Sequence, residues 1–177
     1  MKATGIVRRI DELGRIVIPK EIRKTLRIRE GENLEIYVDT NENIILKKYS
    51  LMNKINDFAQ NFADSIHAFL KHNIIITDTN TIIACSGTQK KEYLNQPISE
   101  KLQSSLLRRE NILEKYEKNF RIIEDKEEKG TYTISAIIAN GDAAGLVIIT
   151  SEHDKITEVE ERVAKIASQF LGKYLEE

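Results

Sequence analysis

The sequence predicts an α+β protein in which a small β-rich N-terminal domain precedes a larger domain built on an antiparallel sheet. Up to about residue 50, short apolar segments alternate with turn residues, as is typical of strands joined by tight turns. Beyond that point, two long segments with helical periodicity, 55–72 and 156–177, enclose several strand-like segments. We therefore expect two domains, residues 1–52 and residues 53–177.

The N-terminal domain is expected to contain a hairpin, a helical corner and a second hairpin. Pro19 ends the second strand because it cannot donate to a sheet ladder, and it suits the first position of a helix. Ile22 and Leu26 lie four residues apart, on one face of that short helix. In chain order the expected elements are a strand (4–11), a turn (11–14), a strand (15–18), a helix (19–26), a strand within 29–39, a turn (40–43) and a returning strand (44–48).

This domain is too small to be stable as a single copy. It has about 50 residues, no possible disulfide and no evident metal site. A unit of that size buries too little apolar surface to offset the entropy lost on folding, and its strands have unpaired edges. We therefore expect a dimer in which two copies share one β core.

The second domain reads as helices and strands around an antiparallel sheet. Its strongest signal is Asn140-Gly141 between two apolar runs, which predicts a hairpin. The expected elements are a helix (55–72), a strand, turn and strand (73–87), a helix within 96–111, a strand (119–125), a solvated turn (126–130), the hairpin (131–151) and a helix (156–177). The small residues beside the hairpin turn are typical of a tight turn. Alternatively, the sheet and helix 98–109 enclose a small-molecule pocket.

The first and last helices of this domain carry apolar stripes that allow two arrangements. In the last helix one stripe contains Val159, Val163, Ile166, Ala167, Phe170, Leu171 and Leu175. Either both stripes cover their own sheet, or the two helices lie together and pair with a second subunit as four helices.

Charge is distributed unevenly along the chain, although the net charge is only -1. Residues 1–29 carry nine Lys or Arg against three Asp or Glu, a net of +6, and the remaining residues carry a net of -7. A basic end on an acidic body indicates a local site for a polyanion, and the alternative is an ordinary solvated surface. The basic residues are Lys2, Arg8, Arg9, Arg15, Lys20, Arg23, Lys24, Arg27 and Arg29. Residues 1–36 contain no aromatic side chain for stacking on single-stranded bases, so double-stranded DNA is the better target.

Several other classes of protein are disfavoured. The single cysteine, Cys85, fits a reducing cytoplasm and is interpreted as a small buried core residue rather than a pocket residue. The N-terminus lacks the apolar core of a signal peptide, and no apolar run approaches the roughly 18 residues of a membrane span. No catalytic, metal or phosphate-loop motif is present, and His67 and His72 are not spaced to share a metal. We expect neither an enzyme nor a cofactor or metal site.

The segment "TGIVRRIDELGRIVIPKEIR" closely resembles the N-terminal domain of AbrB-type transition-state regulators. The resemblance implies a swapped-hairpin β-barrel formed by a dimer, which binds double-stranded DNA through arginines on its strands and corner. Arg8, Arg15, Arg23 and Lys24 match the family's DNA-contacting positions, and Arg9 lies beside them. Lys24 stands where relatives often have Arg, so we expect a phosphate contact there.

The remainder of the chain, through "EYLNQPISEKL" and "IIANGD", is similar to the GAF-type domain that some of these regulators carry. The resemblance implies a regulator of sporulation genes, an activator or a repressor, that acts in the cytoplasm, specifically in the forespore. It further implies a tetramer, a dimer of dimers, paired through helices 55–71 and 156–175. Such domains often bind small molecules, but no ligand-binding residue can be transferred, and Ala143-Ala144 departs from the expected residues beside the turn.

Two alternative functions stay open. The chain could be an antitoxin-like module that neutralises a protein toxin, since the swapped-hairpin fold also occurs there. The periodic, foldable second domain argues against this, because such antitoxins usually end in a flexible acidic tail. The chain could also be a small-molecule sensor without DNA binding, although Arg8, Arg15 and Arg23 argue against that.

Overall fold

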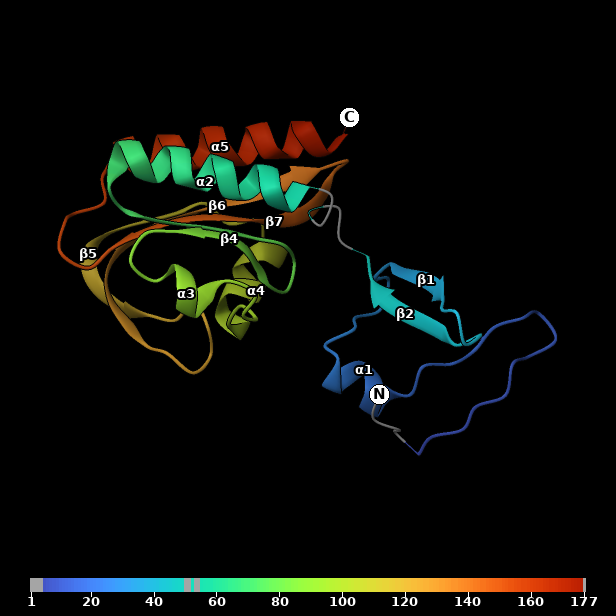
Figure 1. Cartoon of the computed structure of the whole chain (residues 1–177). Coiled ribbons are helices and arrows are strands. Elements are labelled where there is room, and N and C mark those ends of the chain that lie inside the picture. Colours follow the sequence, from blue (N-terminus) through green and yellow to red (C-terminus); the bar gives the residue numbers. More distant parts are fainter. Residues whose placement is uncertain (1–4, 50–51, 53–54, 177) are drawn as a thin grey trace. The chain divides into compact units, whose positions relative to one another are not determined.

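The computed structural model describes residues 5–49, 52 and 55–176. The chain divides into two compact units, Met1–Tyr49 and Ser50–Glu177, and each is described by itself (Figure 1). The expected domain boundary between residues 52 and 53 falls in a segment of which only Met52 is described, so it stays a prediction. The basic residue Lys2 also lies outside the described residues.

The first unit contains a short helix and one hairpin, as the sequence predicts. Helix α1 (Lys20–Thr25) begins directly after Pro19. Strands β1 (Leu34–Val38) and β2 (Ile44–Lys48) pair antiparallel with Ile36 opposite Leu46. The carboxylate of Asp39 accepts the backbone N–H groups of Asn41 and Asn43 at 2.8 and 2.9 Å, which fixes the connecting turn.

The strands predicted for residues 4–11 and 15–18 are not formed within the described part of this chain. Residues 11–14 do make the predicted turn, but the arms on either side of it have no regular ladder. The physical reason is that a strand needs a partner, and no other strand of residues 5–49 pairs with these arms. The arms and the turn between them leave six large apolar side chains exposed, namely Ile6, Val7, Ile10, Leu13, Ile16 and Val17.

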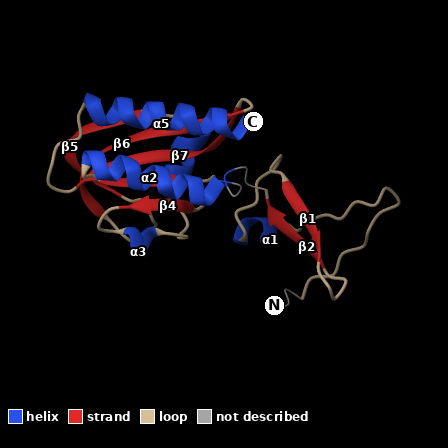
Figure 2. Cartoon of the chain, turned by 45° about the horizontal axis from the view of Figure 1, so that its top comes forward, coloured by secondary structure: helices blue, strands red, loops and turns tan. Residues whose placement is uncertain are grey.

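The second unit is a five-stranded antiparallel sheet with helices on both faces (Figures 1 and 2). The strand order is β4-β3-β7-β6-β5. The strands are β3 (Asn73–Thr77), β4 (Ile82–Ser86), β5 (Ile112–Phe120), β6 (Glu128–Ala139) and β7 (Asp142–Ser151). The helices are α2 (Asn56–Leu70), α3 (Lys90–Tyr93), α4 (Glu100–Leu107) and α5 (Glu158–Glu176). Figure 2 shows α2 and α5 side by side on one face of the sheet.

Each face of the sheet has its own apolar core, because side chains alternate along the central strands. Ile74 and Ile76 of β3 enter the core under α2 and α5, whereas Ile75 between them enters the core under α3 and α4. Val147 and Ile148 of β7 divide in the same way. The sheet therefore has a face covered by two long helices and a face covered by two short ones.

The sequence prediction was wrong in one segment of this unit, between residues 112 and 130. The strand expected at 119–125 lies earlier, as β5, and only its last two residues overlap the predicted range. Of the solvated turn expected at 126–130, residues 128–130 are instead the start of β6, where Glu128 is buried and hydrogen-bonded to the hydroxyl of Tyr93. The four-residue helix α3 was not predicted.

The apolar stripe predicted for the last helix is divided between two surfaces. Ala164, Ala167 and Leu171 are buried against the sheet, whereas Ile166 is 65% exposed and Phe170 is 47% exposed. Four aromatic rings join α5 to α2, and the closest pair is Phe58 and Tyr174, stacked with centroids 4.5 Å apart. The other two rings are Phe62 and Phe170. The two helices thus cover their own sheet and also leave an apolar outer surface.

Candidate nucleic-acid interface

The turn at residues 11–15 is built around one carboxylate. Asp11 accepts the backbone N–H groups of Leu13 and Arg15 on one oxygen, at 3.0 and 2.8 Å. Its other oxygen accepts the Nε–H of Arg15 at 2.8 Å. Gly14 adopts a left-handed φ of 77°, which glycine reaches without steric cost. The backbone and side-chain hydrogen bonds from Arg15 lower the pKa of Asp11, so this carboxylate stays ionised and fixes the base of the Arg15 side chain.

The helical corner supplies the next two cations. Pro19 accepts the backbone N–H of Arg23 at 2.9 Å, and the C-terminal end of α1 is closed when the N–H of Ile28 donates to the carbonyl of Arg23 at 2.7 Å. The Nε atom of Arg23 is buried and makes no hydrogen bond with the described residues. A guanidinium N–H in that state is a donor that an additional acceptor, such as a phosphate oxygen, would satisfy.

All five sequence-predicted site residues lie in the first unit, and their side chains are accessible. Arg8, Arg9, Arg15 and Lys24 are exposed, and Arg23 is partly buried. Arg8 and Arg9 come from the arm before the turn, Arg15 from the turn, and Arg23 and Lys24 from α1. Within the described residues, the one ion pair that this set forms joins Arg15 to Asp11.

The second unit contains a small apolar cavity whose lining residues were not predicted from the sequence. It lies between α4 and strands β5, β6 and β7 and encloses about 20 Å³. Its wall is formed mainly by Leu102, Phe120, Ile122 and Ile134. These residues come from separate segments, so only the general position between helix 98–109 and the sheet was accessible from the pattern.

Other kinds of site find no support in the described part of the chain. No group of three or more His, Cys, Asp or Glu residues there is placed to hold a metal ion. None of its helices has the length and apolar character needed to cross a lipid bilayer. Cys85 is fully buried in the core under α3 and α4, in agreement with the prediction of a core residue.

Comparison with known families and proteins identifies both parts of the chain. Residues 54–176 match the family model "Stage V sporulation protein T C-terminal, transcription factor". Residues 7–52 match "Antidote-toxin recognition MazE, bacterial antitoxin". The structure of the cofactor-binding GAF domain of the nutrient sensor CodY from Clostridium difficile is similar to this chain with a TM-score of 0.50 at 12% identity, covering 88% of this chain and 94% of that one. This likeness shows a GAF-like fold.

Two curated proteins of Bacillus subtilis are similar in sequence. The transition state regulatory protein AbrB is 69% identical over 49 residues, which are 28% of this chain and 50% of AbrB. Stage V sporulation protein T is 47% identical over 178 residues, which cover the full length of both chains. The chain therefore belongs to the stage V sporulation protein T family of transcription factors.

Proposed function

We propose that this protein is a sequence-preferring regulator of sporulation genes that binds double-stranded DNA through Arg8, Arg9, Arg15, Arg23 and Lys24 of an N-terminal dimer. It acts as an activator or a repressor according to the promoter, in the forespore. The likeness to AbrB, 69% identity over 49 residues, supports the DNA-binding role. Phosphate contacts from exposed arginines give affinity, and DNA shape contributes to the preference for particular sequences.

The observation that carries this proposal is that the first unit has no apolar core within its described residues. None of its described residues is buried, while six large apolar side chains of the arms and of the turn between them are exposed. A second copy that paired with the arms would bury those apolar side chains and supply the missing strand ladder. The exposed apolar side chains and the missing ladder therefore support a swapped-hairpin dimer. In such a dimer each cation would be present twice on one β core.

The outer surface of α2 and α5 supports the proposal that two such dimers associate. Phe69 is 84% exposed, Ile166 is 65% exposed and Val159 is 58% exposed, and all three lie on these two helices. Exposed apolar surface of this kind marks an interaction site. Pairing of α2 and α5 with the same helices of another subunit would bury it as four helices and produce a homotetramer.

A signal bound in the GAF-like unit is the second part of the proposal. The GAF-like fold and the cavity under α4 support such a role. An antitoxin-like module is the alternative function, because residues 7–52 match an antitoxin family model. Against that alternative stands the second unit, whose sheet and helices form two packed cores rather than a flexible tail.

The proposal is tested by fluorescence anisotropy with AT-rich promoter duplexes and the full-length protein. Arg8→Ala, Arg15→Ala and Arg23→Ala should each weaken binding, whereas Arg108→Ala, an exposed arginine of the second unit, should not. Loss of one hydrogen bond to a charged partner costs about 1.5–3 kcal/mol, so we expect roughly a tenfold weakening or more for each variant. Wild-type affinity in all three variants would contradict the proposed interface.

A further inference from the structure

The lining of the cavity under α4 is mostly apolar and includes two side chains that carry hydroxyl groups. Ser105 and Tyr132 both line it and are each only 6% exposed. Both hydroxyl groups can donate and accept a hydrogen bond. Burial raises the pKa of Tyr132, so its hydroxyl stays protonated and able to donate at neutral pH. The cavity therefore offers hydrogen-bonding groups beside its apolar side chains.

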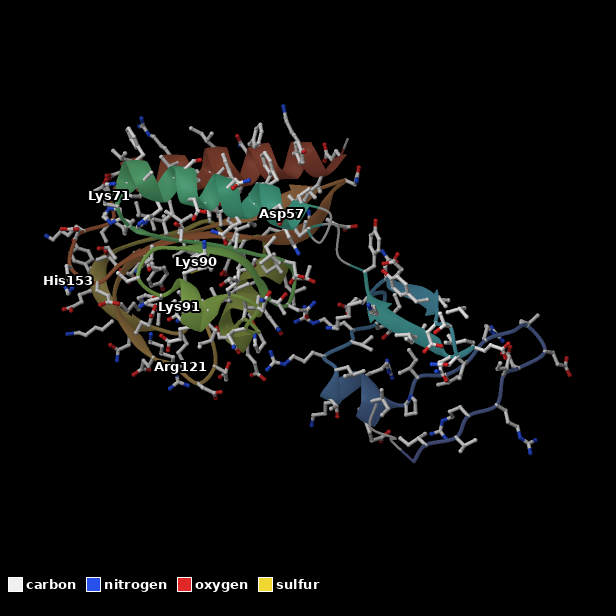
Figure 3. The ribbon with its side chains drawn as sticks, viewed as in Figure 1. Asp57, Lys71, Lys90, Lys91, Arg121 and His153 are labelled. Carbon is white, nitrogen blue, oxygen red and sulfur yellow. The ribbon has the colours of Figure 1, made fainter. Side chains whose placement is uncertain are left out.

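The side chains at the mouth of the cavity are positively charged. Lys101 at the start of α4 and Arg121 after β5 belong to the lining, and none of the lining residues is acidic. Figure 3 shows Arg121 on the side of the sheet opposite to α2, where Lys71 and Asp57 lie. Arg121 is half exposed and pairs with Glu127 at 3.6 Å. Exposed ion pairs of this kind are weak, so another carboxylate can replace Glu127.

The cover of the cavity is the short helix α4. Helix α4 has eight residues and holds the sheet through Leu102 and Leu106. It ends near Arg109, a non-glycine residue in the left-handed region with φ 54°. The enclosed space of about 20 Å³ has room for about one water molecule, so a larger molecule must move α4 or the Phe120 ring outward.

We propose that this cavity is the binding site for a small apolar monocarboxylate. Its hydrocarbon part lies between α4 and the sheet, against Leu102, Phe120 and Ile134, and its carboxylate lies between Lys101 and Arg121. Ser105 and Tyr132 supply the additional hydrogen bonds. The inference rests on the proposed function, because it identifies the chemical class of the signal that the GAF-like unit would detect. Entry of the monocarboxylate would shift α4.

The test is isothermal titration calorimetry of the full-length protein with 4-methylpentanoate, with the uncharged 4-methylpentanamide as the matched control. We expect the acid to bind about tenfold more tightly than the amide, as charge-assisted hydrogen bonds imply. The double variant Lys101→Gln with Arg121→Gln should remove that difference and leave the amide unchanged. Both residues are exposed, so the fold is retained. Arg108→Gln, at the opposite end of α4 from Lys101 and outside the lining, should behave as the wild type.

Absence of binding by 4-methylpentanoate at millimolar concentration would overturn the proposal, as would equal binding of acid and amide. Ser105→Leu, which fills the cavity, should abolish binding of both compounds, and its folding is checked by the heat of unfolding. DNA affinity is measured separately with and without 4-methylpentanoate. A protein that binds the acid but not DNA would refute the proposed function and leave this site standing. A protein that binds DNA but not the acid would do the reverse.

Discussion

Replacing Ile166 by glutamate should break the proposed tetramer into dimers without unfolding the second unit. Ile166 is 65% exposed on the outer surface of α5, so it contributes little to the core of its own subunit. Complete burial of an isoleucine side chain contributes about 1.5–3 kcal/mol, and burial of the exposed two-thirds therefore contributes about 1–2 kcal/mol. A two-fold interface contains the residue twice, which gives about 2–4 kcal/mol in the association free energy.

This loss corresponds to a dissociation constant about 30- to 700-fold weaker for the step from dimer to tetramer. Burial of the new carboxylate would add to the effect. Sedimentation velocity over a dilution series measures this dissociation constant directly. The matched control is Leu107→Glu, since Leu107 is 60% exposed on α4 at the opposite face of the sheet. The reasoning fails if Ile166→Glu assembles as the wild type does, or if Leu107→Glu dissociates equally.

Three further predictions concern individual residues. Gly145→Val should destabilise the second unit by about 1–3 kcal/mol or more, because a Cβ there would lie 1.9 Å from the carbonyl oxygen of Thr77. The measurement is the Tm, which should fall. An unchanged Tm would contradict the close approach of the two strands. Burial raises the pKa of Cys85 to about 12, so the native thiol should not react with thiol reagents at pH 8 and should react once the protein unfolds, whereas rapid native reaction would contradict its position. The hydrogen bonds from Arg15 lower the pKa of Asp11. The ionised carboxylate therefore stabilises the turn fully at a pH above its ordinary pKa of 3.8, and this stabilisation is lost as the pH falls through the lowered pKa of the folded protein. A carbon-detected NMR titration that gave Asp11 an ordinary or raised pKa would contradict the turn geometry.

Elements whose signals are local could be predicted from the sequence. The hairpin of β6 and β7 turns at Asn140 and Gly141, and both adopt positive φ, 51° and 81°, as this dipeptide favours. Helices α2 and α5 follow from apolar residues three and four positions apart. The helical corner at Pro19 follows from the missing N–H of that residue. In each case the residues that decide the structure are neighbours in the chain.

Elements that depend on distant partners were missed. Strand β5 contains Lys115, Glu117 and Lys118 on an exposed edge, so its composition resembles a loop, and only pairing with β6 makes it a strand. Glu128 sits in a run of charged residues, and its burial depends on Tyr93, 35 positions away. The arms of residues 5–18 need a strand that one copy of the chain does not supply. Such pairings cannot be inferred from local pattern.

The candidate sites also divide into features that local sequence signals predict and features that depend on residues far apart in the chain. The cationic cluster could be predicted because charge is visible in composition, and the resemblance assigned positions within it. The lining of the cavity could not, because Ser105, Phe120, Tyr132 and Ile148 come from four different elements. The outer surface of α5 could be predicted only as one of two arrangements, since the stripe alone does not separate the side facing the sheet from the side facing solvent.

The most direct test of the DNA-binding account is the salt dependence of binding. Affinity of the full-length protein for a promoter duplex is measured across a salt series beside Arg15→Ala. Each phosphate contact contributes about -0.9 to the slope of log affinity against log salt, and a dimer contains Arg15 twice. A phosphate-binding Arg15 therefore predicts a steep wild-type slope that becomes shallower by about 1.8 in the variant. A wild type that does not bind at low salt, or a variant with an unchanged slope and affinity, would contradict the account.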